Sequence, residues 1–143
     1  MSTDNLLILT IPGEPMGKQR ARATRQGHQY TPTKTVNYET LVSQLFIEKY
    51  FGHKPLDGAV KIKIDAYFTI PKSASKWKKA AMMAGWIRPT KKPDCDNIAK
   101  IICDALNSLA YIDDKQITDC TVSKFYSEIP RVEAVIEGKE GSA

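Results

Sequence analysis

Five aspartates and one lysine fall close together in the second half of the chain: Asp94, Asp96, Lys100, Asp104, Asp113 and Asp114. Carboxylate oxygens are the ligands that a hard divalent cation such as Mg²⁺ prefers, and two or three suffice when phosphate and water complete the shell. A metal held there would lower the pKa of a bound water and polarise a phosphoryl oxygen. A nearby lysine would stabilise the charge that develops in the transition state. The pattern therefore indicates metal-assisted chemistry on a phosphate.

The same residues also have structural interpretations. An aspartate at the start of a helix caps free N–H groups and suits the helix dipole, which accounts for Asp94 or Asp96 but does not require both. It also leaves the Asp113-Asp114 pair unexplained. Lys100 lies one turn after Asp96 on the polar face of the expected helix, so the two could form a surface ion pair that contributes little.

Other residue types that often carry catalysis give weaker patterns. The three cysteines, Cys95, Cys103 and Cys120, form no CxxC pair, so we expect reduced thiols and no zinc site. The two histidines, His28 and His53, have no candidate partner nearby in the sequence and are expected on the surface.

Charge is unevenly distributed along the chain, whose net charge is +5. Residues 72–92 carry seven cations and no acid, whereas residues 93–119 have a net charge of −4. Either the basic segment is a solvated loop, or it holds a polyanion against carboxylates that bind a metal. Trp77 and Trp86 lie within it and either stack on bases or, the more frequent use of tryptophan, pack in the core.

Length and composition predict one compact domain over residues 1–143. Hydrophobic residues make up 42% of the 143 and charged residues 26%, which excludes a disordered or membrane protein. The apolar run Leu6 to Ile11 is too short to span a bilayer and follows no basic stretch, so we expect no signal peptide and a cytoplasmic protein.

The hydrophobic pattern predicts an α+β fold with a mixed β-sheet and two main helices. Ile98, Ile101, Ile102 and Leu106 repeat at helical spacing after Pro93 and give the clearest helix. The expected order is β-α-β-α-β-β. Its parts are a buried strand at 6–11, a long loop at 12–33, a helix at 34–51, a strand at 60–68, a short helix near 75–84, the helix after Pro93, strands at 116–127 and 131–137, and a frayed tail at 138–143.

The stretch from Pro93 to Gln116 resembles the RusA family of Holliday junction resolvases, small endodeoxyribonucleases often encoded by phages and prophages. PDCDNIAK, DALN and YIDDKQ stand here at the family's spacing. The resemblance implies that Asp94, Asp96 and Asp114 bind Mg²⁺, with Mn²⁺ as a substitute, and that Lys100 is a catalytic cation. Asp104 and Asp113 are second candidates for metal support or structure.

The resemblance also implies a homodimer that resolves four-way DNA junctions by paired symmetric nicks in recombination and repair. A two-fold dimer would match the symmetry of a junction. Phosphate contacts are expected from two basic regions. Their residues are Lys18, Arg20, Arg22, Arg25, Lys76, Lys78, Lys79, Lys91 and Lys92. Two alternatives remain: a non-catalytic architectural DNA-binding protein, and a metal-dependent phosphatase or nuclease acting on other branched or single-stranded DNA.

Overall fold

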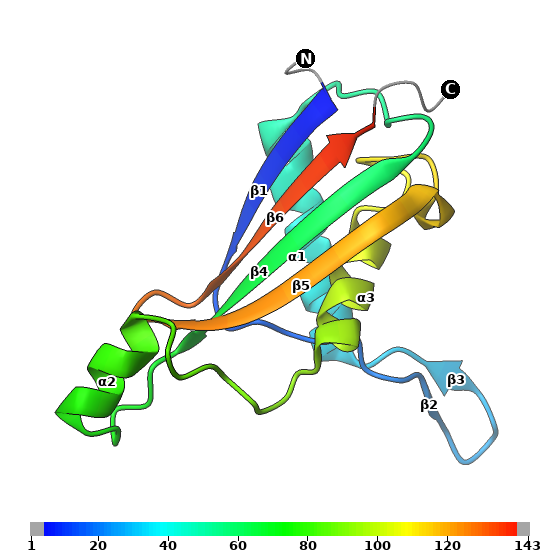
Figure 1. Cartoon of the computed structure of the whole chain (residues 1–143). Helices are drawn as coiled ribbons and strands as arrows, with labels where there is room; N and C mark the ends of the chain where they lie inside the picture. The colour runs from blue at the N-terminus through cyan, green and yellow to red at the C-terminus, as the bar shows by residue number, and fades with distance from the viewer. Residues whose placement is uncertain (1–4, 140–143) are drawn as a thin grey trace.

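A four-stranded mixed sheet forms the centre of the computed structural model, which describes residues 5–139 (Figure 1). The strand order is β1 (Leu6–Pro12), β6 (Arg131–Gly138), β4 (Val60–Thr69) and β5 (Ile117–Ser127). Only the β4–β5 pair is parallel; β1–β6 and β4–β6 are antiparallel. Within residues 5–139, no helix is long and apolar enough to cross a membrane. The expected single α+β domain with a mixed sheet is confirmed.

One face of the sheet is buried, because apolar residues alternate with polar ones along its strands. Ile62 and Ile64 of β4 are fully buried, whereas Lys61 and Lys63, which alternate with them, are exposed. In β1 the same alternation buries Leu7 and Leu9 but leaves Leu6 and Ile8 exposed. The expectation of a wholly buried first strand is therefore wrong, because the helices cover only one face of the sheet to which β1 belongs.

Two helices cover the buried face, α1 (Thr33–Lys49) and α3 (Cys95–Ala105) (Figure 1). Val42 and Phe46 of α1 are buried, as expected from helical spacing. In α3, Ile98, Ile101 and Ile102 are all fully buried. The apolar stripe predicted after Pro93 is thus the face that α3 presents to the sheet.

The direction of α3 follows from the parallel pairing of β4 and β5. Two parallel neighbours cannot be joined by a tight hairpin, so the chain must cross back over the sheet between them. The chain makes that return as α3, whose first residue contacts the middle of β5: Cys95 Sγ lies 3.9 Å from the Val122 carbonyl oxygen. Beyond the end of α3 the chain enters β5 at Ile117, which pairs with Val60 at the start of β4. The two ends of α3 therefore point in opposite directions along the strands: its start lies beside the middle of β5, and the chain after its end enters β5 beside the start of β4.

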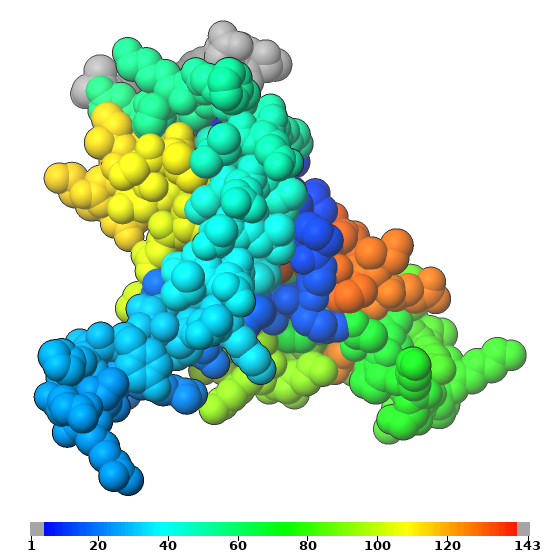
Figure 2. Space-filling view, turned by 180° about the vertical axis from the view of Figure 1, so that it is seen from behind, coloured from blue at the N-terminus to red at the C-terminus, as the bar shows by residue number. Residues whose placement is uncertain are grey.

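The structure contains short elements beyond the expected order. A small hairpin, β2 (Arg22–Ala23) with β3 (Gln29–Tyr30), lies within the segment expected to be a loop. The expected short helix is α2 (Lys76–Met83), and a 3₁₀ turn, η2 (Asp114–Gln116), precedes β5. Figure 2 shows the hairpin (blue) and α2 (green) as separate projections from the body.

The expected frayed tail is wrong for its first two residues. Gly138 pairs with Val60 at the end of β6, and the Lys139 N–H donates to the Ala59 carbonyl oxygen at 3.0 Å. The remaining residues of that segment, 140–143, lie outside the described part of the chain.

Two buried tyrosines give a paired test of the core. The Tyr111 hydroxyl donates to the Cys103 carbonyl oxygen at 2.6 Å, whereas the buried Tyr38 hydroxyl has no partner among the described residues. Tyr111→Phe should lower the free energy of unfolding by about 1–2 kcal/mol, since it leaves a buried carbonyl without its donor. Tyr38→Phe should leave stability equal or higher, because it removes an unpaired buried hydroxyl. Urea unfolding of both variants checks this, and a larger loss from Tyr38→Phe would contradict it.

Candidate active site

The start of α3 presents two carboxylates that no other group uses. Asp94 occupies the N-cap position, yet its side chain makes no capping hydrogen bond. Asp96 lies in the first turn, and both residues are exposed. Within residues 5–139, neither carboxylate takes part in a hydrogen bond or an ion pair. The capping interpretation therefore accounts for the position of Asp94 but not for the use of its carboxylate.

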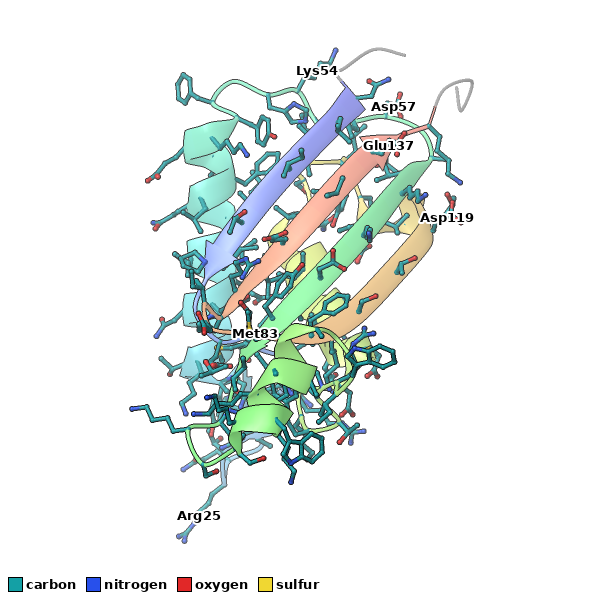
Figure 3. The ribbon with its side chains drawn as sticks, turned by 60° about the vertical axis from the view of Figure 1, so that its left-hand side comes forward. Arg25, Lys54, Asp57, Met83, Asp119 and Glu137 are labelled. Atoms are coloured by element: carbon teal, nitrogen blue, oxygen red, sulfur yellow. The ribbon has the colours of Figure 1, made fainter. Side chains whose placement is uncertain are left out.

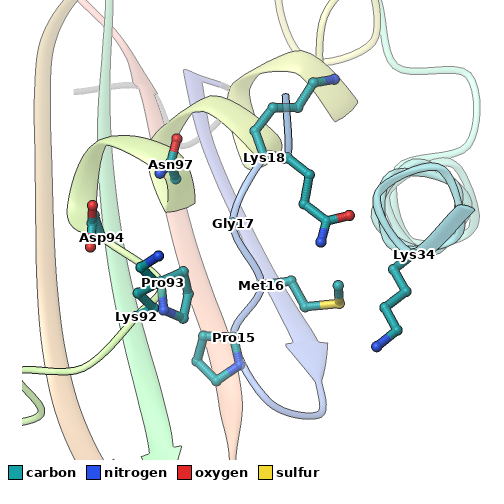
Figure 4. A pocket seen from close by; sticks show the side chains of 10 residues that line it. Pro15, Met16, Gly17, Lys18, Lys34, Lys92, Pro93, Asp94 and Asn97 are labelled. Carbon is teal, nitrogen blue, oxygen red and sulfur yellow. The ribbon is translucent and has the colours of Figure 1, made fainter. Parts of the chain in front are cut away.

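A polar pocket of about 480 Å³ opens beside Asp94 (Figure 4). Its walls are the loop after β1, the segment leading into α3, and the start of α1. Figure 4 shows Lys92 and Asp94 on one side and Lys34 on the other. A pocket that combines a carboxylate with three lysines, Lys18, Lys34 and Lys92, suits a phosphate held together with a divalent metal ion.

The loop that forms one wall approaches α3 very closely at Gly17. A Cβ added to Gly17 would lie 2.8 Å from Pro93 Cβ and 2.9 Å from Asn97 Cβ, so only glycine fits. The Lys18 N–H then donates to the Asn97 carbonyl oxygen at 2.9 Å. This contact positions the loop against the motif residues of α3.

Lys100 is exposed on the same helix, and no ion pair joins it to Asp96 among the described residues. The surface-pair interpretation is therefore wrong in this structure. One turn of helix places the Lys100 ammonium on the polar face that begins with Asp96. It is free to contact an anion bound near the start of α3.

Asp113 and Asp114 differ sharply in their surroundings. Asp113 is the N-cap of η2: its carboxylate accepts from the Lys115 N–H, and the Gln116 side chain accepts from the Asp113 N–H. The hydrogen bond from Lys115 lowers the pKa of Asp113, and a hydrogen bond shared with Asp113 raises the pKa of Asp114. The Asp114 N–H is held by the Asn107 side chain at 3.0 Å, while its own side chain is exposed. Asp113 therefore has a structural role that Asp114 lacks.

Lys18 and Asp104 form a structural cluster with Glu39. The Lys18 ammonium lies 2.8 Å from Glu39 Oε2 and 3.3 Å from Asp104 Oδ2, with all three side chains partly buried. Burial lowers the pKa of Lys18, but Glu39 and Asp104 outweigh this, so it lies above the ordinary 10.5. The expected phosphate contact from Lys18 is not supported by this geometry, because its charge already joins the loop to α1 and α3.

One copy of the chain does not bring all the predicted carboxylates together. Eight residues of helix separate Asp96 from Asp104, which is about 12 Å at 1.5 Å per residue. Asp114 lies at the Asp104 end, since the nearby charge of Asp104 contributes to its raised pKa. Within residues 5–139, no three acidic, histidine or cysteine side chains are grouped to hold a metal ion.

The other predicted cations are exposed and lie in two regions. Arg20, Arg22 and Arg25 belong to the loop and the β2–β3 hairpin. Lys76, Lys78 and Lys79 lie on α2, and Lys91 and Lys92 lie in the segment that leads to Asp94. Figure 3 shows Arg25 extending from one end of the molecule, with Lys54 at the opposite end. In Figure 2 the two basic regions flank a concave surface that carries the segment entering α3.

The match to a family model decides the class of protein. The model described as "Endodeoxyribonuclease RusA" matches residues 12–137, which include both basic regions, the pocket and all the predicted carboxylates. This chain belongs to the RusA family. It is also 42% identical over 135 residues to "Uncharacterized protein YqaN" of Bacillus subtilis (strain 168), covering 89% of this chain and 92% of that protein. Membership of the RusA family makes hydrolysis of DNA phosphodiester bonds the class of reaction.

Two residues that line the pocket beside Asp94 were not identified from the sequence as site residues. Lys34 is far from the motif in sequence but lines the pocket from the start of α1. Asn97 lines it from α3 and was noted only as part of the motif. The net positive charge of residues 1–34 indicated that Lys34 could contact an anion. Its distance from Asp94 in the sequence gave no indication that the two residues share a pocket.

Substitution of Lys18 should affect stability, whereas substitution of Arg25 should affect only DNA binding. Lys18→Met should lower the free energy of unfolding by about 1–3 kcal/mol, because it leaves Glu39 and Asp104 without their shared cation. Folding raises the pKa of Lys18 above its ordinary 10.5. The stability that the Lys18 ion pairs contribute is therefore complete below pH 10.5, and it is lost as the pH rises through the pKa of the folded state. The matched control Arg25→Met removes an exposed cation and should leave stability unchanged while weakening DNA binding. Thermal unfolding and DNA titration of both variants check this; equal midpoints would contradict it.

Proposed function

We propose that this protein is a Mg²⁺-dependent endonuclease that resolves four-way DNA junctions. The observation that carries the proposal is the pair of unused carboxylates at the start of α3, beside a pocket with Lys34 and Lys92. An exposed acid beside a DNA-binding surface weakens binding unless a cation neutralises it. These carboxylates therefore argue against a purely architectural DNA-binding protein.

The residues at the start of α3 fit a hard divalent ion. Asp94 and Asp96 supply only oxygen donors, which is the donor set that Mg²⁺ and Mn²⁺ prefer. When bound, the ion would lower the pKa of a water and polarise the scissile phosphate. Lys100 would stabilise the charge that develops on the phosphate, and the pocket cations would hold the neighbouring phosphates.

A homodimer accounts for both the substrate and the separated carboxylates. A four-way junction has two-fold symmetry, and a two-fold dimer presents two equivalent sites to its two strands. Asp114 lies at the far end of α3 from Asp94 within one copy. We propose that Asp114 of one copy completes the site at Asp94 and Asp96 of the other.

The activity is tested with a labelled synthetic four-way junction. The wild-type chain should give paired symmetric nicks with Mg²⁺ or Mn²⁺ and none with EDTA. Asp94→Asn should reduce cutting at least 100-fold while junction binding is retained or strengthened, because a negative charge is removed from the DNA-binding surface. Tight binding without cutting at any divalent ion would reject the proposal in favour of an architectural protein. Preferred cutting of flaps, duplex or single strands would reject the junction as its substrate.

The shared site is tested by mixing two inactive variants. If Asp114 acts across the dimer, a heterodimer of Asp94→Asn and Asp114→Asn chains contains one doubly altered site and one intact site. Mixing the two inactive chains, with refolding to exchange subunits, should therefore restore single-strand nicking. If both residues act within one copy, every site carries a substitution and the mixture stays inactive. Wild type mixed with Asp94→Asn controls for subunit exchange.

A further inference from the structure

The α2 arm, which we define as residues 72–92, exposes two indole rings. The exposed fraction is 67% for Trp77 and 84% for Trp86, and Met83 is also exposed. The expectation that tryptophan packs in the core is therefore wrong for both residues. Among the described residues, neither indole contacts another aromatic ring or a cation. In Figures 1 and 2 the arm projects away from the sheet, which leaves both indoles available to a partner.

The base of the arm is held rigidly. Arg88 lies over the Phe125 ring, 4.1 Å from its centre, and donates to the Lys124 carbonyl oxygen. Lys124 in turn donates to the Lys91 carbonyl oxygen. At the tip, the backbone N–H of Trp86 donates to the Ala81 carbonyl oxygen at 2.9 Å, which closes the turn after α2. The indoles are therefore presented on an ordered support, which lowers the entropy cost of binding.

The charge of the arm identifies the chemistry of its partner. The arm has seven cations and no acid, and none of them forms an ion pair among the described residues. Its partner must therefore combine dense negative charge with flat apolar faces. Unpaired nucleic-acid bases flanked by phosphates have both properties, whereas a duplex hides the faces of its bases.

We propose that the α2 arm binds unstacked bases at the branch point of the DNA, with Trp77 and Trp86 stacking on base faces. Lys76, Lys78 and Lys79 contact the flanking phosphates. Residues 84–92 of the arm lead from α2 to Pro93 and Asp94, so the arm and the carboxylates would act on the same DNA molecule. The inference rests on the proposed function for the choice of DNA, but it does not depend on cutting.

The chain carries its own probe for this contact. It contains two tryptophans, and both lie on the arm, so intrinsic tryptophan fluorescence reports on the arm alone. The full-length Asp94→Asn chain is titrated with an immobile four-way junction or with linear duplex of the same arm sequence. Stacking should quench the emission strongly with the junction and weakly with the duplex. Equal quenching by both DNAs at saturation would overturn the proposal.

Substitution of the indoles gives an independent measurement. In the Asp94→Asn background, Trp77→Ala and Trp86→Ala should each weaken junction binding about 5- to 100-fold by anisotropy, with less than a 2-fold change for duplex. Both side chains are exposed, so thermal unfolding midpoints should not change. Phe51→Ala is the matched control, because Phe51 is 89% exposed and lies three residues before Lys54, at the opposite end of the molecule from Arg25 (Figure 3). It should not alter junction binding.

A third measurement locates the contact on the DNA. With 2-aminopurine at the branch point, binding should change its fluorescence, and Trp77→Ala together with Trp86→Ala should abolish that change. With 2-aminopurine within an arm of the junction, binding should have no effect. Junction affinity unchanged by both substitutions would overturn the role of the arm, even if wild-type cutting proves normal. Conversely, a chain that binds branch points through the indoles but never cuts would contradict only the proposed function.

Discussion

The parallel pairing of β4 with β5 is the constraint on which the arrangement of the site depends. Because β4 and β5 run in the same direction, the chain must leave the end of β4, return over the sheet and enter β5 beside the start of β4. The crossing segment is α3, whose apolar face completes the core. Asp94 and Asp96 therefore lie at the end of α3 beside the middle of β5, and Asp113 and Asp114 lie beyond its other end, where the chain enters β5. The division of the carboxylates is a result of topology rather than of local sequence.

Partners distinguish the acids that stabilise the fold from those available for chemistry. Asp104 is satisfied by Lys18, and Asp113 is satisfied by backbone N–H donors of η2. At the sheet, Arg131 pairs with Glu133. Asp94 and Asp96 have no such partner within the described residues, although a helix N-terminus offers free N–H groups close by. Exposed oxygen ligands at the start of a helix are accessible to a divalent cation.

The elements that bury an apolar face could be predicted from the sequence, and those held by polar contacts could not. The alternation of apolar and polar residues predicted β4, and the isoleucine spacing predicted α3, because burial itself produces these periods. The β2–β3 hairpin has only exposed residues, so no hydrophobic pattern marks it. The outward exposure of Leu6 and Ile8 depends on one face of the sheet having no helix over it, which sequence spacing does not reveal.

Only part of the candidate site could be predicted, because contacts between segments far apart in the sequence leave no sequence pattern. The motif identified Asp94, Asp96 and Lys100, which lie within two turns of one helix. It did not reveal that Lys18 is neutralised by Glu39, because that pair joins a loop to a helix 21 residues away in the sequence. Nor did it reveal the distance between Asp94 and Asp114, since a resemblance assigns roles to residues without placing them in space.

The position of the α2 arm in the chain has an evolutionary consequence. It is inserted between β4 and α3, two elements whose relative placement is already fixed by the sheet. Lengthening such a connection costs little stability, about 0.6 kcal/mol for each doubling of a flexible loop. Selection can therefore lengthen, shorten or replace residues 72–92 without moving the carboxylates that follow. The fold thus separates the segment that carries the proposed base contacts from the helix that carries the proposed metal-binding carboxylates, so one can change in length while the other keeps its place.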